Sequence, residues 1–373
     1  MRVIYLIVFC FAVLCCQRGN VKTEIIDLDR NDSVSIFDLV DSISVIKLET
    51  LPECLIRDIY KICSYKNKLY IFDRMSGTVF CFDKNGKFLF KINKQGRGPD
   101  EYVYAEFINI DKFNDNVMIL VPWGQILFFD LDGNFKKKII LPKEIIAYNE
   151  VYSMSKDVLL FLSNNEYRAS YYSLSKDKII KRSLKTTEAQ ARIMVSFDKT
   201  FEYNDSLYFN DNSINSKIIN LSDTSYPIKY TWNFGKDSNT LKQINNLYLL
   251  ELSLRKQKKR IEREEICNDN NYPNYLPFYS IESKTFRGIS VRHRGVYKCV
   301  FYNKKTKKYL VLKETIEGNI PIHFLRSENT LINRYSDKKK DAIFKILNDR
   351  QKKHLQSFDP YKDNPILYIY HIK

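Results

Sequence analysis

Glycine, proline and tryptophan are scarce in this chain of 373 residues, which contains 11, 10 and 2 of them. Disordered chains are typically rich in glycine and proline and poor in aromatic residues, so the composition excludes disorder as the general state. The chain also has little that could cross a membrane as a helix. Its apolar run from Val3 to Leu14 has 12 residues, whereas a spanning helix needs about 20.

Linear motifs of several enzyme classes are also missing. The sequence contains no Gly-x-x-x-x-Gly-Lys-Ser/Thr phosphate loop, no Gly-x-Ser-x-Gly nucleophile elbow and no Cys-His nucleophile arrangement. The four histidines, His293, His323, His354 and His371, form no pair at the spacing of metal ligands. A metalloenzyme that gathers its ligands from separate parts of the fold leaves no linear motif, so that class stays open as an alternative.

Cysteine indicates neither a metal site nor a disulfide framework. Five cysteines follow Cys16, an odd number whose spacings match no zinc or disulfide pattern: Cys54, Cys63, Cys81, Cys267 and Cys299. Cys63 and Cys81 are predicted on strands separated by a third strand, too far apart for a bridge. We expect most of these side chains to be small buried hydrophobic groups.

Aromatic residues and positive charge are plentiful. The 24 Phe, 26 Tyr and 44% hydrophobic content are typical of strands around a packed core. The net charge of +16 favours anionic partners in general. The positive residues fall in lysine-rich turns and two helical stretches, without an aromatic-interleaved RNA-binding motif, so we predict no nucleic-acid partner.

The N-terminus predicts export. Arg2 and the short apolar run fit a signal peptide, and Val13-Leu14-Cys15-Cys16 resembles a bacterial lipobox. We predict a lipoprotein signal peptide over residues 1–16 with Cys16 lipidated, because the residue before the modified cysteine should be small and Leu14 is not. Cys15 as the modified residue, a plain signal peptide and an uncleaved anchor stay as alternatives. Residues 17–42 are polar and predict a tether followed by a short amphipathic stretch.

A repeat of strands and tight turns begins near residue 43. The segment FDKNGKF at 82–88 returns as FDLDGNF at 129–135, which places the matching residues 47 positions apart. Gly86 and Gly133 supply the positive φ that a tight hairpin needs, and Asp83 and Asp130 are expected to bind turn amides. A period near 47 with four strands per unit is typical of a β-propeller blade.

Counting these units predicts an all-β, six-bladed propeller of four-stranded blades over residues 43–373. Helical inserts interrupt it near 240–265 and 338–355. The last blade lacks one strand, and the segment ISVIKLE at 43–49 has no blade of its own. We therefore predict that this segment pairs with the final strand and closes the ring, leaving no open sheet edge.

Several segments resemble a known family. ISVIKLETLPECLIRDIYKI, KLYIFD, FDKNGKFLFKI, GRGPDEY and the ending DNPILYIYHIK are similar to the six-bladed β-propeller lipoproteins of Bacteroides-type bacteria, which are related to NHL-repeat propellers. The resemblance covers about residues 40–373 and implies the fold and a location in the cell envelope. Residues 17–20 lack the acidic run that resembles a surface-export signal in these bacteria. We therefore predict an outer-membrane lipoprotein that faces the periplasm.

Four residues are candidates for ligand binding. Arg97, in Gly96-Arg97-Gly98-Pro99, is predicted in a crossing loop between blades, where it either reaches over the ring mouth or pairs with Asp100 or Glu101. In that loop Gly96 and Gly98 are expected to adopt unusual backbone angles.

The other candidates are aromatic and basic. Trp123 and Trp232 could stack on sugar rings or lie in the core, and Trp123 is kept as a site residue. Arg292 and His293, with Arg287 and Arg294 nearby, predict an anion-binding patch or an exposed turn.

These observations favour a binding or scaffolding module of the cell envelope that is not an enzyme. Its expected partners are a glycan, a peptide or an envelope protein, and the membrane through the lipid anchor. We expect no cofactor and no stoichiometric metal. The alternative is a hydrolase or lyase with a metal in the central channel.

Overall fold

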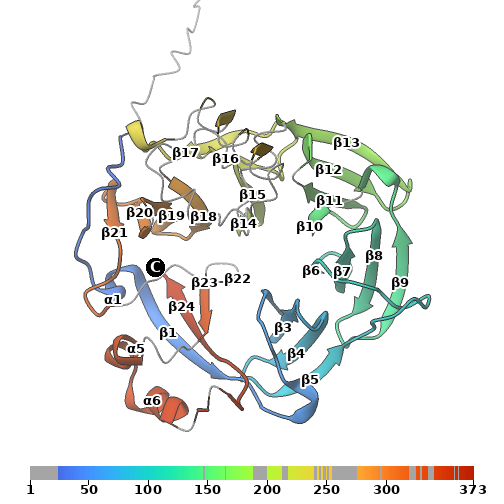
Figure 1. Ribbon diagram of the computed structural model, residues 1–373, viewed down its shortest axis with the longest axis horizontal. Coiled ribbons are helices and arrows are strands. Elements are labelled where there is room, and N and C mark those ends of the chain that lie inside the picture. Colours follow the sequence, from blue (N-terminus) through green and yellow to red (C-terminus); the bar gives the residue numbers. More distant parts are fainter. Residues whose placement is uncertain are drawn as a thin grey trace, which may run out of the picture.

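A computed structural model of the chain describes most residues from 24 onward. These are residues 24–145, 148–163, 165–187, 200–211, 217–238, 275–294, 296–318, 325–327, 330–334, 340–356, 358–359 and 361–373, with isolated residues between 242 and 253. They form six antiparallel sheets of four strands each, which lie around a common centre in Figure 1. The protein is therefore an all-β propeller with four-stranded blades.

In five of the six sheets the strands follow one another in chain order. The first two sheets are β2 (Lys61–Tyr65), β3 (Lys68–Asp73), β4 (Thr78–Asp83) and β5 (Phe88–Ile92), then β6 (Phe107–Asp111), β7 (Asn116–Val121), β8 (Gln125–Asp130) and β9 (Phe135–Ile140). The next two are β10 (Tyr148–Ser153), β11 (Val158–Ser163), β12 (Tyr167–Ser173) and β13 (Lys178–Lys185), then β14 (Thr200–Tyr203), β15 (Ser206–Asp211), β16 (Lys217–Asn220) and β17 (Ile228–Thr231). The fifth is β18 (Tyr275–Glu282), β19 (Phe286–His293), β20 (Val296–Asn303) and β21 (Lys308–Leu312).

The sixth sheet joins the two ends of the domain. It contains β22 (Leu325–Ser327), β23 (Thr330–Arg334), β24 (Ile366–Ile372) and β1 (Val40–Lys47), and β1 pairs with β24 from Val40 opposite Ile372 to Lys47 opposite Ile366. The predicted pairing of the segment at 43–49 with the final strand is thereby confirmed. It gives the edge of β24 a partner and so removes an open sheet edge.

Burial along each strand follows its place in the blade. Every residue of β7, the second strand of its sheet, is buried, because neighbouring sheets cover both faces. In β13, the fourth strand, exposed residues alternate with partly buried ones, as the period of a strand with one solvated face requires. The core therefore lies between the blades, and the fourth strands form the periphery (Figure 1).

The two repeated hairpins have the predicted chemistry. Asp83 Oδ1 accepts hydrogen bonds from the backbone amides of Asn85 and Lys87, and Asp130 Oδ1 accepts from those of Asp132 and Asn134. Gly86 and Gly133 have φ values of 90° and 87°. Both predictions are confirmed.

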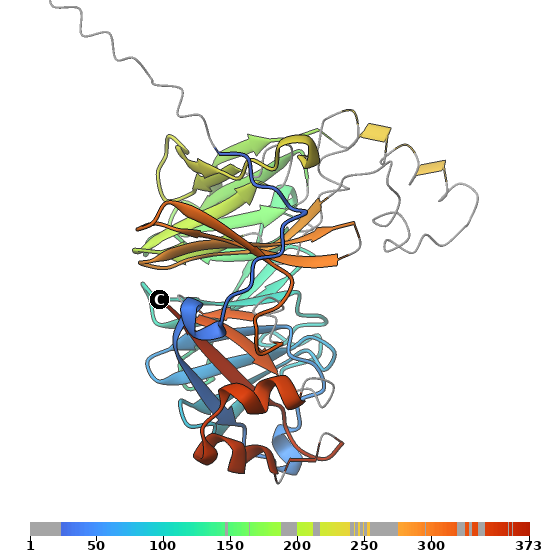
Figure 2. The ribbon, with the colours of Figure 1, turned by 90° about the vertical axis from the view of Figure 1, so that its left-hand side faces the viewer.

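Residues 24–35, here called the N-terminal segment, lie within the range where the sequence predicts a tether. Figure 2 shows this segment running along the outer side of the sheet β18–β21 to α1 (Ile36–Leu39). Ile26 and Leu28 are 1% and 0% exposed, and the Asp32 backbone amide donates to the Val311 carbonyl at 2.6 Å. This part of the range is therefore packed against the propeller.

Helices are few among the described residues. Those with defined bounds, besides α1, are three 3-10 turns, η1 (Pro52–Cys54), η2 (Lys143–Ile145) and η3 (Gly235–Asp237), and the helices α5 (Lys340–Ile346) and α6 (Asp349–Gln356). The helical insert predicted near 338–355 is confirmed by α5 and α6, which lie beside β1 (Figure 2). Most of the insert predicted near 240–265 lies outside the described residues, and the isolated residues described there, at 242, 245–246, 249 and 252–253, are helical. In the part of the chain that is described, no helix is long and apolar enough to cross a membrane.

The described cysteines agree with the sequence analysis. Cys54, Cys63, Cys81 and Cys299 are buried and unbridged, and β3 separates Cys63 in β2 from Cys81 in β4. Cys15, Cys16 and Cys267 lie outside the described residues.

Candidate functional site

The topology brings all four predicted ligand-binding residues to one face. Because strand direction alternates in an antiparallel sheet, the second and fourth strands of each blade end on the same side. The turn after the second strand and the loop that crosses to the next blade therefore share what we call the crossing face. Arg97 lies in the crossing loop after β5, Trp123 in the turn after β7, and Arg292 and His293 at the end of β19.

Trp123 is an exposed aromatic side chain on this face. It is 61% exposed, and its ring centroid lies 5.9 Å from that of Tyr104, with the two rings inclined at 56°. Tyr104 belongs to the crossing loop between the first two sheets. The core alternative is therefore wrong for Trp123, but it is confirmed for Trp232, which is 1% exposed.

A charged pair borders these rings. Arg74, in the turn after β3, donates from Nε to the Tyr104 hydroxyl at 2.8 Å and from Nη2 to both Glu106 carboxylate oxygens at 2.9 and 2.8 Å. Its guanidinium also lies 4.7 Å from the centroid of the Tyr60 ring. We call these five residues, Trp123, Tyr104, Arg74, Glu106 and Tyr60, the Trp123 platform.

The charged groups at the border of the platform are held in place by their hydrogen bonds. Burial by itself would lower the pKa of Arg74, but the hydrogen bond to Tyr104 and the charge of Glu106 raise it, so the guanidinium stays charged. An ion pair of this geometry fixes the orientation of Tyr104, against which Trp123 packs. The exposed indole thus offers a flat apolar surface next to hydrogen-bond donors and acceptors.

Arg97 does not pair as one hypothesis held. Lys94 forms the ion pair with Asp100 at 2.8 Å, and Glu101 accepts a hydrogen bond from the Gly98 amide at 2.7 Å. Arg97 itself is exposed and has no hydrogen bond or ion pair within the described residues. Pairing with Asp100 or Glu101 is therefore wrong, while its role in ligand binding stays a prediction.

The two glycines of this loop differ from other residues there by their lack of a side chain. Neither Gly96 nor Gly98 is among the residues with positive φ, so the expected unusual backbone angles are wrong. A Cβ atom at Gly96 would lie 2.0 Å from Glu101 Oε2, and one at Gly98 would lie 3.1 Å from it. The absence of a side chain at both positions leaves room for the Glu101 carboxylate, which folds back over the backbone of the loop.

The basic residues of β19 do not form one patch. Arg287 lies at the start of the strand with its guanidinium between the rings of Tyr230 and Tyr302, at 4.2 and 4.1 Å. Arg292, at the other end, lies 5.6 Å from the Tyr297 ring centroid. The expectation of a shared anion-binding patch is therefore wrong for Arg287.

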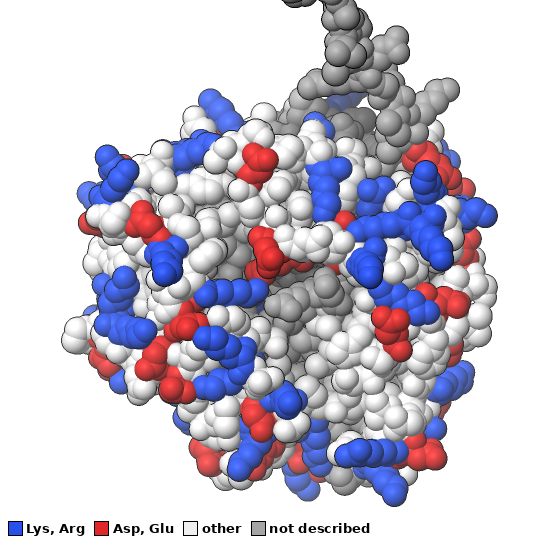
Figure 3. Space-filling model, turned by 180° about the vertical axis from the view of Figure 1, so that it is seen from behind, with Lys and Arg blue, Asp and Glu red and all other residues white. Residues whose placement is uncertain are grey.

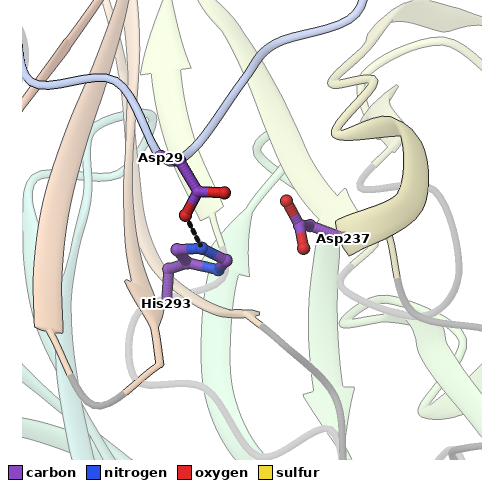
Figure 4. A group of neighbouring side chains, drawn as sticks. All are labelled: Asp29, Asp237 and His293. Atoms are coloured by element: carbon purple, nitrogen blue, oxygen red, sulfur yellow. Dashed lines mark hydrogen bonds and ion pairs between the residues drawn. The ribbon is translucent and has the colours of Figure 1, made fainter. Parts of the chain in front are cut away.

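His293 faces an acidic residue of the N-terminal segment. It is 2% exposed, and its Nε2 lies 3.2 Å from Asp29 Oδ1, which also lies 3.2 Å from Arg294 Nη1. The hydrogen bond with His293, together with the charge of Arg294, lowers the pKa of Asp29 although burial opposes this. Figure 4 shows a third member, Asp237 of η3, whose carboxylate points toward the pair. The three side chains have candidate ligand atoms within 4.8 Å of one another.

Residues 23–371 match the family described as "Domain of unknown function (DUF4934)". The chain belongs to this family. No curated protein matches it. Two solved structures share its fold, one described as a "Putative exported protein" from Bacteroides fragilis NCTC 9343 and one a member of the DUF4221 family from Bacteroides vulgatus.

These two structures resemble this chain in their fold. The first has a TM-score of 0.73 at 15% identity and covers 92% of this chain and 98% of the other. The second has a TM-score of 0.52 at 9% identity and covers 90% and 97%. At such identities the similarity shows that this DUF4934 chain is a propeller like these proteins.

The surface of the DUF4934 chain also has a groove of about 1350 Å³. It lies between β1, β24, α6 and the turn after β4, and none of the four predicted site residues lines it. The side chains of Lys84, Lys87 and Arg350 line it and form no hydrogen bond or ion pair with other described residues. Elsewhere, on the face seen in Figure 3, Lys and Arg are interspersed with Asp and Glu.

Sequence reasoning missed most partners of Trp123 and His293 in this DUF4934 chain. Arg74 and Glu106 are 32 positions apart, and Asp29 and His293 are 264 apart, so no linear spacing relates them. One signal was available. Tyr104 and Glu106 lie in the same crossing loop as GRGPDEY, and the crossing loops share one face with the turns after the second strands.

Proposed function

We propose that this DUF4934 chain is an exported, lipid-anchored binding module of the cell envelope, and that it binds carbohydrate on the Trp123 platform. Each of the six sheets is one blade of a closed ring in this proposal. The observation that carries it is the 61% exposure of Trp123 beside the fixed Tyr104, Arg74 and Glu106 groups.

The chemistry of the platform suits a sugar ring. A pyranose has an apolar face of C–H groups and an edge of hydroxyls, so it needs a flat aromatic surface with donors and acceptors beside it. Tryptophan supplies the largest such surface of any side chain. The Arg74 and Glu106 pair and the Tyr104 hydroxyl lie where the hydroxyl edge of a stacked sugar would reach.

The location rests on the first residues of the chain. The apolar run and Val13-Leu14-Cys15-Cys16 support export and lipidation at Cys16. The absence of an acidic run at 17–20 supports an outer-membrane lipoprotein that faces the periplasm. In this position the platform would bind glycan fragments that enter or are assembled in the envelope.

The two tryptophans provide the test. A Trp232→Phe variant retains Trp123 as its single tryptophan, so its fluorescence reports on the platform alone. We expect a glycan array to identify a bound glycan, and that glycan to change the emission of this variant and shield it from acrylamide. Trp123→Ala should weaken binding at least tenfold.

Two further variants distinguish the platform from other surfaces. Phe113, 48% exposed in the turn after β6, lies on the face opposite the platform, so Phe113→Ala should bind normally. Arg350→Ala alters the groove instead. Binding that survives Trp123→Ala but is lost in Arg350→Ala would move the site to the groove. A folded protein that binds no glycan, while a peptide or envelope protein binds it through Trp123, would overturn the carbohydrate assignment.

A further inference from the structure

One member of the group formed by Asp29, Asp237 and His293 is a largely buried carboxylate that no described residue pairs. Asp237 is 3% exposed, and its carboxylate has no hydrogen bond or ion pair with the described residues. A buried carboxylate without compensation is costly, so proteins normally pair it or let it coordinate a metal. In Figure 4 the carboxylate points into the space that Asp29 and His293 border.

We propose that Asp29, Asp237 and His293 bind a divalent cation of the zinc type. The donor set is one imidazole nitrogen and two carboxylate oxygens, which zinc accepts at about 2.0–2.2 Å in tetrahedral geometry. Two ligands at such distances from one ion lie about 3.3 Å apart, and the His293 Nε2 to Asp29 Oδ1 distance is 3.2 Å. Asp237 completes three protein ligands and leaves a fourth position to water.

The charged residues around the site would both strengthen and weaken the binding of a cation. Coordination of the ion by these three ligands would neutralise the negative charge of Asp237, which no described residue pairs. Arg294, half exposed, contacts Asp29 at 3.2 Å, and it can keep that contact through the second carboxylate oxygen. Lys298, whose amine donates to the Leu28 and Arg30 carbonyls, adds positive charge nearby and weakens the attraction for a cation.

The site would join three separate parts of the chain. Asp29 comes from the N-terminal segment, Asp237 from η3 after β17, and His293 from the end of β19. None lies on the innermost strand of its blade, so this site is distinct from a metal in the central channel. The bound ion would hold the N-terminal segment across the fourth and fifth sheets and so fix where the chain leaves the propeller toward Cys16. This proposal replaces the expectation of a metal-free protein.

The test uses the whole exported chain, stripped with chelator and then titrated with Zn²⁺. We expect one zinc per chain by calorimetry and elemental analysis, a higher melting temperature with zinc, and visible absorption typical of tetrahedral cobalt when Co²⁺ is substituted. Ligand that binds only the native state raises apparent stability, so the melting shift should saturate with the binding curve.

Asp237→Asn gives the sharpest readout because it separates the two roles of this side chain. It should weaken zinc binding at least tenfold, yet leave the melting temperature of the stripped protein unchanged or higher, since it removes an unpaired buried charge. His293→Gln should also lose zinc, whereas His354→Gln, an exposed histidine of α6, should keep it. Failure of the stripped, folded wild-type chain to bind zinc stoichiometrically, or wild-type affinity in Asp237→Asn, would overturn the proposal.

Discussion

Ile43 and Tyr370 lie opposite each other across the antiparallel pair of β1 and β24, although 327 positions separate them in the chain. Both are buried, at 8% and 2% exposure, in one core cluster with α5 and α6 residues. The first and last strands of the domain therefore share a blade. We therefore expect the stability of the ring to depend on the pairing of β1 with β24.

Removal of β1 should open the ring. A chain lacking residues 40–47 leaves the edge of β24 unpaired, so we expect aggregation and a much lower melting temperature. The milder Ile43→Ala should cost about 2–5 kcal/mol of unfolding free energy, the usual range for truncation of a buried Ile. Thermal melts and light scattering measure both effects, with exposed Asp41→Ala as the control in the same strand. A 40–47 deletion that melts like the intact chain would show that closure contributes little.

Two glycines with similar positive φ values should differ in their tolerance of a side chain. Gly86 and Gly318 have φ values of 90° and 84°. A Cβ at Gly86 would lie 2.3 Å from the Lys47 carbonyl oxygen, whereas the nearest atom to one at Gly318 is 3.5 Å away. We expect Gly318→Ala to cost about 1–2 kcal/mol of backbone strain. Gly86→Ala should cost roughly 1–3 kcal/mol more, from overpacking against a backbone that pairs with β24.

Urea unfolding of the two variants measures this difference. Equal losses would mean that the chain near Lys47 yields easily and that strain alone decides the effect.

The turn held by Asp130 should weaken in acid. Burial by itself would raise its pKa, but hydrogen bonds from the Asn134 side chain and from the Asn134 and Asp132 amides hold the pKa of Asp130 below its ordinary value of 3.8. A lowered folded-state pKa contributes stability above pH 4 that is lost as the pH falls through the folded value. We expect Asp130→Ala to cost about 1–3 kcal/mol at pH 7, and the difference from wild type to shrink near pH 2–3.

Urea unfolding at both pH values checks this expectation. Asp132→Ala is the control in the same turn, because its exposed ion pair with Lys68 should contribute at most about 1 kcal/mol. A difference between wild type and Asp130→Ala that stays constant with pH would contradict the role of the carboxylate charge.

Local features of the sequence were sufficient for the blades. The turn residues of FDKNGKF and FDLDGNF act within their own hairpins, so their bonds and positive φ values follow from a few neighbouring residues. The closing strand was also predictable. The segment at 43–49 alternates but has no blade of its own, and the last blade lacks a strand, so pairing them satisfies the unpaired backbone groups of both. Periodicity carries this information because each strand must bury one or both faces.

The candidate sites depended on contacts between distant segments, which only the tertiary structure decided. The sequence marked Trp123 and His293, but the exposure of Trp123 depends on how the turn after β7 packs against Tyr104 of the preceding crossing loop. Arg74, which borders Trp123, and Asp29, which contacts His293, come from distant segments. Their spacing along the chain follows no repeat. Propeller geometry brings the ends of second and fourth strands to one face, and side-chain chemistry on that face is fixed by packing between blades. No local pattern could show that Asp237 is buried without a hydrogen bond or ion pair to its carboxylate from the other described residues.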